Sequence, residues 1–202
     1  QVRVKGGRAT GVVLDNGNEL AAKVVVSSLD PRRTFTQLVN ASELPDDFVA
    51  AIKRYKFRGS SGKVNLALSE LPNFTCLPGV GPHLRGAFSM SPSLDYVERA
   101  YDDAKYGEFS RQPYMDIVIP SMIDPGMAPP GKHVMSIFVQ YAPYHLKGGW
   151  DDAKREAFGD AVVDTVSQFA PNLKGAILHR QVLTPVHIER ITGLTQRNIF
   201  QS

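Results

Sequence analysis

The opening stretch of the chain contains two tight-turn signals that separate three strand-like runs. Gly6-Gly7 stands between the first two runs, and Asp15-Asn16-Gly17-Asn18 stands between the second and the third. Asn-Gly between β-rich runs is the strongest short-range signal for a hairpin, because a type I′ turn needs positive φ at both central residues. The first 26 residues therefore predict a three-stranded β-meander. Its third run ends in Val24-Val25-Val26, an unbroken apolar stretch that predicts a sheet strand covered on both faces.

After Pro31 the pattern changes to helices mixed with strands. Apolar periodicity and capping residues predict helices over 31–39, 45–56, 93–106 and 151–169, and a short helix from Pro185. Strand patterns cover 63–68, 114–120, 133–143 and 176–185, of which 133–143 is apolar on both faces and predicts a central strand. The order lacks strict alternation of strand and helix. It therefore predicts an α+β fold with a mixed β-sheet and helices packed on one face.

Composition excludes several classes of function. The 202 residues are 43% hydrophobic and 21% charged, and the net charge of +3 comes from scattered basic residues. We expect no nucleic-acid partner, because such proteins need a basic face. No apolar run reaches the length of a membrane span. Cys76 cannot form an internal disulfide, and the five histidines lack metal-ligand spacing, so we expect no metal site.

No catalytic constellation is visible in the residues themselves. Ser60-Ser61-Gly62-Lys63 matches an S-x-x-K nucleophile pattern, but its usual partner motifs are absent and Lys63 begins a predicted strand. No G-x-G-x-x-G occurs, so the chain lacks a dinucleotide fingerprint of its own. The catalytic residues stay unknown at this level, and chance is the preferred explanation of the S-x-x-K match.

Several long stretches together resemble a known family. They are GRATGVVLDNGNELAAKVVVSSLDPRRTFTQLV, KVNLALSELPNF, AYDDAKYGEFSRQPYMDIVIPSMIDPGMAPPGKHVMSIFVQYAPY and LTPVHIERITGLTQRNIF. In this order they resemble the middle and later parts of FAD-dependent, phytoene-dehydrogenase-like oxidoreductases. The likeness covers nearly the whole chain, and the long central block is its most specific part.

The resemblance implies a larger flavoprotein of two interleaved domains. Residues 1–30 would belong to the FAD-binding domain, 31–195 would form the substrate domain, and 196–202 would begin the return to the FAD domain. On this interpretation the chain is an interior piece of its protein, inactive alone. FAD would bind to the complete protein and not to this chain by itself. The expected partners are the rest of the FAD domain and, through an exposed apolar patch, a second copy of the chain.

The resemblance also suggests site residues. On the cofactor side we expect the following positions: Ser27, Ser28, Asp30, Asn198 and Gln201. On the substrate side we expect strand residues of mixed character: Asn65, Phe88, Met115, Phe138 and Tyr141. One departure from the family is marked, because Gln196-Arg197 stand where the family usually has Gly or Gly-Gly before the Asn. A side chain there bears on how closely the backbone can approach a flavin.

The implied reaction is hydride transfer from an apolar small molecule to flavin, of the desaturase or dehydrogenase type. The flavin carries that chemistry, which agrees with the lack of catalytic acids and bases in the sequence. We expect a cytoplasmic or organelle-matrix location, and the resemblance leaves peripheral membrane contact open. The alternative is a stand-alone binding or interaction module without redox activity, which would have a sealed core. A hydrolase that uses Ser60 and Lys63 is a third reading.

Overall fold

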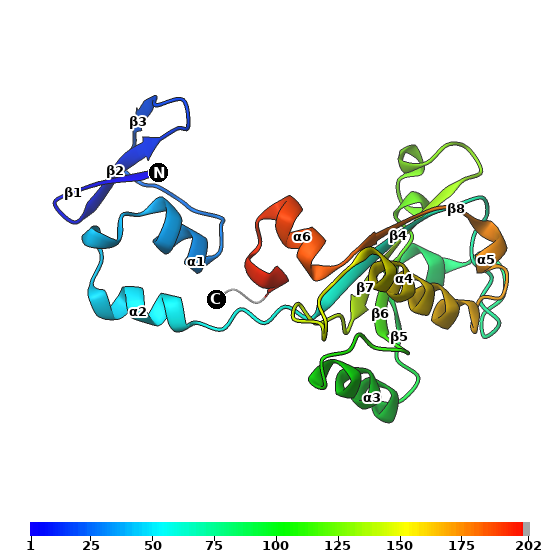
Figure 1. Ribbon diagram of the computed structural model, residues 1–202. Coiled ribbons are helices and arrows are strands. Elements are labelled where there is room, and N and C mark those ends of the chain that lie inside the picture. The colour runs from blue at the N-terminus through cyan, green and yellow to red at the C-terminus, as the bar shows by residue number, and fades with distance from the viewer. Residues whose placement is uncertain (200–202) are drawn as a thin grey trace.

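The computed structural model describes residues 1–199 and has an α+β fold, as the sequence predicts (Figure 1). Its strands form a three-stranded sheet in the order β1-β2-β3 and a five-stranded sheet in the order β5-β6-β7-β4-β8. Every strand pair in both sheets is antiparallel, so the predicted mixed sheet is wrong. Strand direction depends on how distant segments return to the sheet, which the local pattern of each strand does not contain.

The bounds of the elements agree with most of the predicted helices and strands. The strands are β1 (Val2–Lys5), β2 (Arg8–Val13), β3 (Glu19–Ala21), β4 (Ser61–Leu68), β5 (Phe88–Met90), β6 (Tyr114–Val118), β7 (His133–Gln140) and β8 (Ile177–Leu183). The helices are α1 (Pro31–Arg33), α2 (Asp46–Arg54), α3 (Leu94–Lys105), α4 (Asp152–Ser167), α5 (Leu173–Ala176) and α6 (Pro185–Thr192). Short helical turns include η1 (Thr34–Leu38), which continues α1, and η6 (Thr195–Arg197), which follows α6.

The predicted meander is present, but the strand expected after it is not. Residues 24–26 are not in a strand, and within residues 1–199 no other strand pairs with them. Val24 and Val26 leave 74% and 89% of their surface exposed, whereas the sequence predicts burial on both faces. An apolar run indicates that a segment is suited to burial. It is buried only where another segment, distant in the sequence, packs against it.

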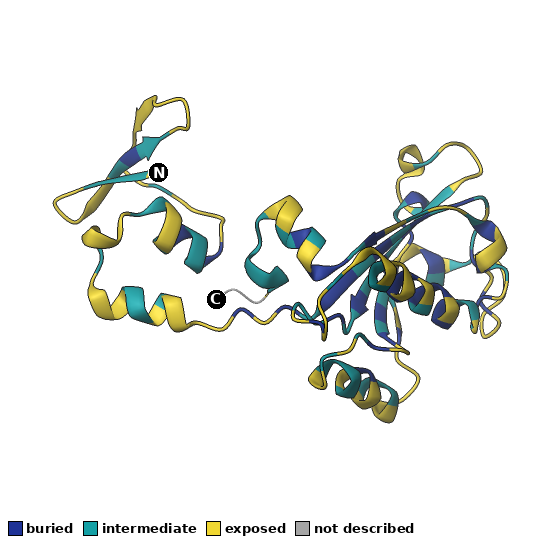
Figure 2. Cartoon of the chain, viewed as in Figure 1, coloured by how far each residue is buried: buried dark blue, intermediate teal, exposed yellow. Residues whose placement is uncertain are grey.

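The five-stranded sheet has one covered face. Val64 and Leu66 of β4 and Ile137 of β7 are almost fully buried there, together with Phe158 and Val162 of α4. Figure 1 shows α4 lying across the strands, and Figure 2 shows the buried residues concentrated along β4, β7 and the sheet side of α4. The prediction of helices on one face is therefore confirmed. On the opposite face, the alternate residues of β4 and β7 are half-buried.

The helix ends follow the signals in the sequence. The Ser93 side chain accepts a hydrogen bond from the backbone N–H of Tyr96 at 3.1 Å at the start of α3, and Gly107 follows its end with φ +86°. Asp151 caps α4 by accepting from the Lys154 backbone N–H at 2.7 Å. Thr184 caps α6. These caps account for the close agreement between predicted and observed helix starts.

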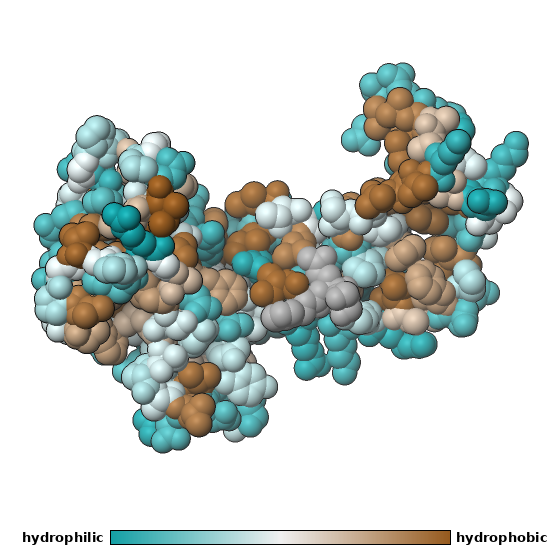
Figure 3. Space-filling model, turned by 180° about the vertical axis from the view of Figure 1, so that it is seen from behind, coloured by the Kyte–Doolittle hydropathy of each residue, from teal (hydrophilic) through white to brown (hydrophobic). Residues whose placement is uncertain are grey.

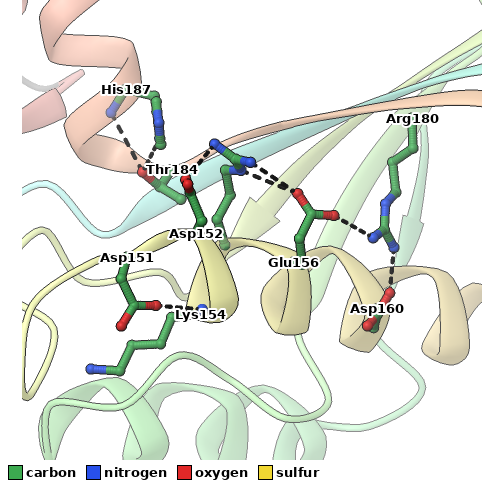
Figure 4. A network of polar contacts seen from close by, with 9 residues as sticks. Asp151, Asp152, Lys154, Glu156, Asp160, Arg180, Thr184 and His187 are labelled. Atoms are coloured by element: carbon green, nitrogen blue, oxygen red, sulfur yellow. Dashed lines mark hydrogen bonds and ion pairs between the residues drawn. The ribbon is translucent and has the colours of Figure 1, made fainter.

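An ion-pair network fastens α4 to β8 at the edge of the sheet. Arg180 of β8 contacts Glu156 at 2.7 Å and Asp160 at 2.6 Å, one turn apart on α4. Arg155 joins Glu156 at 3.2 Å and Asp152 at 2.9 Å (Figure 4). Most of these groups are exposed, so each pair stabilises the fold by less than about 1 kcal/mol.

Two parts of the chain lie at opposite ends of the molecule in Figure 1. The meander, α1 and α2 lie at one end, and the five-stranded sheet with α3, α4 and α5 lies at the other. Phe35 of η1 and Phe48 of α2 pack edge to face, with ring centroids 4.9 Å apart, which holds residues 31–54 together. The domain boundary at residue 30 stays a prediction, and α1 and α2 lie beside the meander. An extended segment around Gly59 and the stretch after α6 connect the two ends.

Candidate cofactor and substrate sites

A cavity of about 300 Å³ lies where the end of the chain meets the loop before α1. Its lining comes from two segments far apart in sequence: Ser28, Leu29, Asp30, Ile188, Thr192, Gly193, Leu194 and Arg197. Ser28 and Asp30 are two of the residues predicted for the cofactor side. The structure therefore brings them beside the segment in which Asn198 was predicted.

Asp30 is the group that joins these two segments. Its carboxylate accepts the backbone N–H of Arg33 at 3.0 Å, which caps α1. The same carboxylate accepts from the backbone N–H of Thr195 at 3.2 Å and from the Thr195 hydroxyl at 2.8 Å. Only 2% of Asp30 is exposed, so this charge is stabilised by three donors rather than by water. The arrangement makes Asp30 a positioning group that fixes the cavity wall.

The other predicted cofactor residues have different places. Ser27 is exposed and lies outside the cavity lining; its hydroxyl forms a 2.8 Å hydrogen bond with that of Thr34. Asn198 is half-buried, and its backbone N–H donates to the Thr195 carbonyl at 3.1 Å. Gln201 lies outside the described residues. The cofactor role of all five stays a prediction.

The turn that ends the cavity has an unusual backbone. Gln196 and Arg197 have φ of +48° and +56°, the left-handed region that favours glycine. The resemblance described above leads us to expect Gly or Gly-Gly before Asn198, so the chain has here a backbone path typical of glycine with two bulky side chains. Burial lowers the pKa of the Arg197 guanidinium. Its Nε atom is buried and has no hydrogen-bond partner among residues 1–199.

Glu189 of α6 holds this turn from the other side. One carboxylate oxygen accepts the backbone N–H of Gln196 at 2.9 Å, and the other accepts the hydroxyl of Tyr144. The hydrogen bond to Glu189, together with burial and the carboxylate charge, raises the pKa of Tyr144 to about 12. Neither residue carries a motif that would have identified it in the sequence. Their role follows only from the return of α6 toward the loop after β7.

The uncovered face of the five-stranded sheet contains two of the predicted substrate residues. Asn65 of β4 lies opposite Ser136 of β7 on one side and Gln181 of β8 on the other. Phe138 lies two residues after Ser136 on the same face of β7. The Asn65 amide donates to Gln181 Oε1 at 2.9 Å, and its oxygen accepts the Ser136 hydroxyl at 3.0 Å. A row of polar groups therefore crosses three strands beside an aromatic ring.

A second polar cluster lies on the same face, where β6 pairs with the edge strand β5. Tyr114 donates its hydroxyl proton to Asp116 at 2.8 Å, and Ser89 of β5 donates to the same carboxylate oxygen. The Ser89 contact lowers the pKa of Tyr114, but the Asp116 hydrogen bond, burial and nearby charge outweigh it, so the pKa is raised overall. Figure 3, which shows the molecule from behind, has hydrophilic and hydrophobic residues interspersed over the half that contains the five-stranded sheet.

Three other predicted substrate residues lie elsewhere. Met115 and Phe88 point to the helix-covered face, where Met115 is fully buried and Phe88 packs against Phe74 with centroids 5.2 Å apart. Plain core packing accounts for both. Tyr141 follows β7, donates its backbone N–H to Ser110 at 2.8 Å and packs edge to face with Tyr101. It lies at the end of the uncovered face rather than within it.

A larger cavity lies away from all of these residues. It has a volume of about 1070 Å³ and is an open, polar groove between α3 and α4. Its acidic side chains include Asp103 and Asp160, which already pair with Arg111 and Arg180. Among residues 1–199, no three His, Cys, Asp or Glu side chains gather as a metal site, and no helix is long and apolar enough to cross a membrane.

The chain is similar to curated proteins over most of its length. It is 39% identical over 202 residues to pyridine nucleotide-disulfide oxidoreductase domain-containing protein 2 of Rattus norvegicus, and equally to that of Mus musculus. It is 28% identical over 192 residues to prolycopene isomerase 2 of an Oncidium hybrid cultivar. These alignments cover 96% and 92% of this chain, but only 35% and 29% of the relatives. No family model matches the chain.

Solved structures share the fold. An oxidoreductase from Methanosarcina mazei superposes with a TM-score of 0.54 at 19% identity, covering 91% of this chain and 36% of that one. A protein from Pyrococcus furiosus gives 0.52 at 18% identity, covering 86% and 34%. The chain is therefore a homologue of pyridine nucleotide-disulfide oxidoreductase domain-containing protein 2 and of prolycopene isomerases, and it spans 35% or less of their length.

Proposed function

We propose that this chain forms the substrate-binding part, and one wall of the cofactor site, of an FAD-dependent oxidoreductase. The observation that carries the proposal is the convergence of two distant segments at one cavity. Ser28 and Asp30 meet Thr195 and Arg197 there, across 165 residues of sequence. The homologues support the enzyme class, because they are named as oxidoreductase-domain proteins and as isomerases.

The residues at the cavity fit part of a dinucleotide. Arg197 supplies a buried guanidinium nitrogen without a partner among the described residues. Ser28, which carries a hydroxyl group, lines the same cavity, and Asp30 fixes the position of the cavity wall. A flavin bound in the complete protein would supply the hydride acceptor of the reaction. In this proposal the chain's own residues bind and orient, and they contribute no general acid or base.

The uncovered sheet face is the proposed substrate wall. It carries Phe138 for apolar contact and the Asn65–Ser136 pair for orientation, on strands whose backs are fixed by the core. Sites built on strands hold side chains more precisely than sites on loops. The predicted apolar substrate is retained, and the polar row on this face would orient any hydroxyl or carbonyl group that the substrate carries.

The exposure of Val24 and Val26 weighs against a sealed, stand-alone binding module. Two neighbouring valines with most of their surface in water are typical of a surface that another segment or chain covers. In the proposal that cover is the rest of the FAD domain. The module reading would require these side chains to be buried within the chain itself.

The test is the cofactor content of the complete protein. We expect the purified complete protein to show the visible absorption of oxidised flavin, and the separately expressed 202-residue chain to be colourless. Asp30→Ala should lower the flavin content of the complete protein, whereas Asp15→Ala, in an exposed turn, should not. A complete protein that releases no flavin on denaturation would overturn the proposal.

Oxidation of the substrate can be measured, in the absence of oxygen, as the loss of the visible absorption of the oxidised flavin. Phe138→Ala should raise the substrate concentration needed for half-maximal bleaching without changing flavin content. Leu178→Ala is the matched control, because Leu178 is exposed on β8 and lies away from the row. Equal effects of the two substitutions would remove the uncovered face from the proposal.

A further inference from the structure

The uncovered face of the five-stranded sheet contains a carboxylate that has no cationic partner among residues 1–199. Asp116 of β6 is half-buried and takes part in no ion pair there. The hydroxyl groups of Tyr114 and Ser89 both donate to the same oxygen, Oδ1. Oδ2 therefore receives no hydrogen bond from the part of the chain that the structure describes, and it is accessible to solvent.

Aromatic side chains lie beside this carboxylate. Phe138 is the direct neighbour of Asp116 across the pair of β6 and β7, and directly opposite residues of an antiparallel pair point to the same face. Tyr114 lies two residues before Asp116 on that face, and its hydroxyl donates to the carboxylate at 2.8 Å. A carboxylate among aromatic rings suits an organic ammonium group, which gains an ion pair and a cation–π contact together.

The strand register places these residues in one row that also contains a cation. The row crosses all five strands and consists of Leu183, Lys63, Phe138, Asp116 and Ser89. Lys63 and Asp116 lie on opposite sides of Phe138. Since neighbouring strands are about 4.8 Å apart, their backbones are about 10 Å from each other. The net charge of the row is zero, but its two ends differ in sign, and Lys63 also forms no ion pair within residues 1–199.

This separation of charge gives the face a direction. An ammonium group is attracted to Asp116 and repelled by Lys63, so it should lie at the β6 end of the row. The apolar ring of Phe138 between the two charges then remains for the hydrocarbon part of the same ligand. A carboxylate ligand would lie the other way round, with its charge at Lys63.

We propose that this row binds an organic amine in its protonated form, with the ammonium group at Oδ2 of Asp116 and the apolar part on Phe138. The hydroxyl groups of Tyr114 and Ser89 hold the carboxylate through Oδ1 and leave Oδ2 for the ligand. If the uncovered face is the substrate wall, the substrate is an apolar amine. That assignment rests on the proposed function, whereas amine binding does not.

A purely structural role for Asp116 makes a different prediction. In that role the carboxylate would only join β5 to β6 through the hydroxyl groups of Ser89 and Tyr114. Such a link needs an acceptor oxygen but no charge. Asp116→Asn keeps an acceptor oxygen and the size of the side chain while it removes the charge, so this substitution separates the two roles.

The experiment measures binding of n-hexylammonium chloride to the complete protein by saturation-transfer difference NMR at about pH 7.5, where an alkylammonium group is charged. Hexanol and hexanoate are comparison probes of the same chain length. We expect the ammonium probe to bind most tightly, and we expect Asp116→Asn to weaken its binding about fivefold or more without an effect on hexanol. Asp15→Asn is the matched control, because it removes the same charge from an exposed turn.

Phe138→Leu tests the aromatic ring separately from the charge. Leucine keeps an apolar side chain but has no π-system, so the ammonium probe should bind about twofold to fivefold more weakly. Binding of hexanol should change little. Circular dichroism of each variant confirms that the fold is retained.

Three outcomes would overturn the inference. Absence of saturation transfer to the ammonium probe would show that no amine binds. Equal weakening by Asp116→Asn and Asp15→Asn would show attraction by net charge alone. Tighter binding of hexanoate than of hexylammonium would assign the row to an anionic ligand at Lys63.

Flavin content separates this inference from the proposed function, because the NMR measurement does not depend on a bound flavin. Hexylammonium binding by a complete protein that contains no flavin would keep the amine site and reject the flavoenzyme. A flavin-containing complete protein that does not bind hexylammonium would keep the flavoenzyme and reject the amine.

Discussion

The carboxylate of Asp30 accepts two hydrogen bonds from Thr195, one from its backbone and one from its hydroxyl, across 165 residues of chain. Asp30 lies in the loop before α1 and Thr195 begins the short helical turn η6, so the contact links that loop directly to the turn after α6. A buried carboxylate with three donors is more than a local cap. It fixes the relative position of two segments that line one cavity.

This link predicts strong energetic coupling. Asp30→Ala leaves the Thr195 and Arg33 backbone donors without their acceptor and should lower the free energy of unfolding by about 2–3 kcal/mol. Thr195→Val removes only the hydroxyl and should cost less. Urea denaturation of both single variants and the double variant gives the coupling energy, for which we expect about 1 kcal/mol or more. Strict additivity would show that the contact does not stabilise the fold.

The left-handed turn predicts a stabilising substitution. Gln196→Gly should raise the free energy of unfolding by about 0.5–1 kcal/mol, because relief of the left-handed conformation exceeds the extra entropy of a glycine in the unfolded chain. The comparison is Gln168→Gly, where Gln168 has an ordinary helical φ of −63° at the end of α4. That variant should lose stability in the same urea titration. A loss at both positions would argue against strain at Gln196.

Gly59 lies too close to the same turn for any side chain. A Cβ atom there would lie 1.8 Å from the backbone oxygen of Gln196 and 2.7 Å from the carbonyl carbon of Arg197. Backbone atoms cannot turn aside as a side chain can, so Gly59→Ala should cost about 1–3 kcal/mol. Gly175→Ala is the control, because its Cβ would meet no atom within 4 Å. Thermal unfolding should show a lower midpoint for the first variant and an unchanged or higher one for the second.

Tyr144 predicts a pH dependence at the alkaline end. Its pKa rises from 10.0 to about 12 through the hydrogen bond to Glu189, so the folded protein holds this proton more tightly than the unfolded chain. The stabilisation is present below pH 10 and is lost as the pH rises toward 12. The difference in unfolding free energy between the unchanged chain and Tyr144→Phe should shrink across that range. Tyr106→Phe, at an exposed position, should show no such trend.

The α4–β8 network predicts a salt-sensitive contribution. Arg180→Met removes both ion pairs to α4 while keeping an unbranched apolar stem, and should cost about 0.5–1 kcal/mol at low ionic strength. Since salt screens exposed pairs, the cost should fall in 1 M sodium chloride. Lys174→Met serves as a comparison, because Lys174 forms a single exposed pair with Asp164. A cost of Arg180→Met that is independent of salt would point to packing instead.

Most helices and strands were predictable because their signals are local. Ser93 with the apolar stripe of α3, and Asp151 with that of α4, specify a start, a face and an end within one segment. The alternation of β4 likewise assigns Val64 and Leu66 to the core. The direction of the strands and the cover over Val24 were not predictable, because they depend on segments far away in the sequence.

The candidate site was predictable only in part. The resemblance placed Ser28, Asp30 and Asn198 in segments that the structure brings together. Alternation along β6 contained the information that Met115 and Ile117 share a face, and it would have assigned Met115 to the core. The roles of Glu189 and Tyr144 were not predictable from the sequence. An acid on a helix and a tyrosine in a loop carry no local signal of the contact that the fold makes between them.

The place of β4 between β7 and the edge strand β8 also determines when the five-stranded sheet can be completed. β4 ends at Leu68, but its two neighbours are residues 133–140 and 177–183. On the ribosome, one edge of β4 would stay unpaired until β7 (residues 133–140) had been made, and its other edge would stay unpaired until β8 (residues 177–183) had been made. Such a strand is an aggregation hazard during synthesis, and pairings this distant slow folding. Ribosome-bound chains that end before β8 should therefore depend on a chaperone, and chains that extend beyond α6 should not.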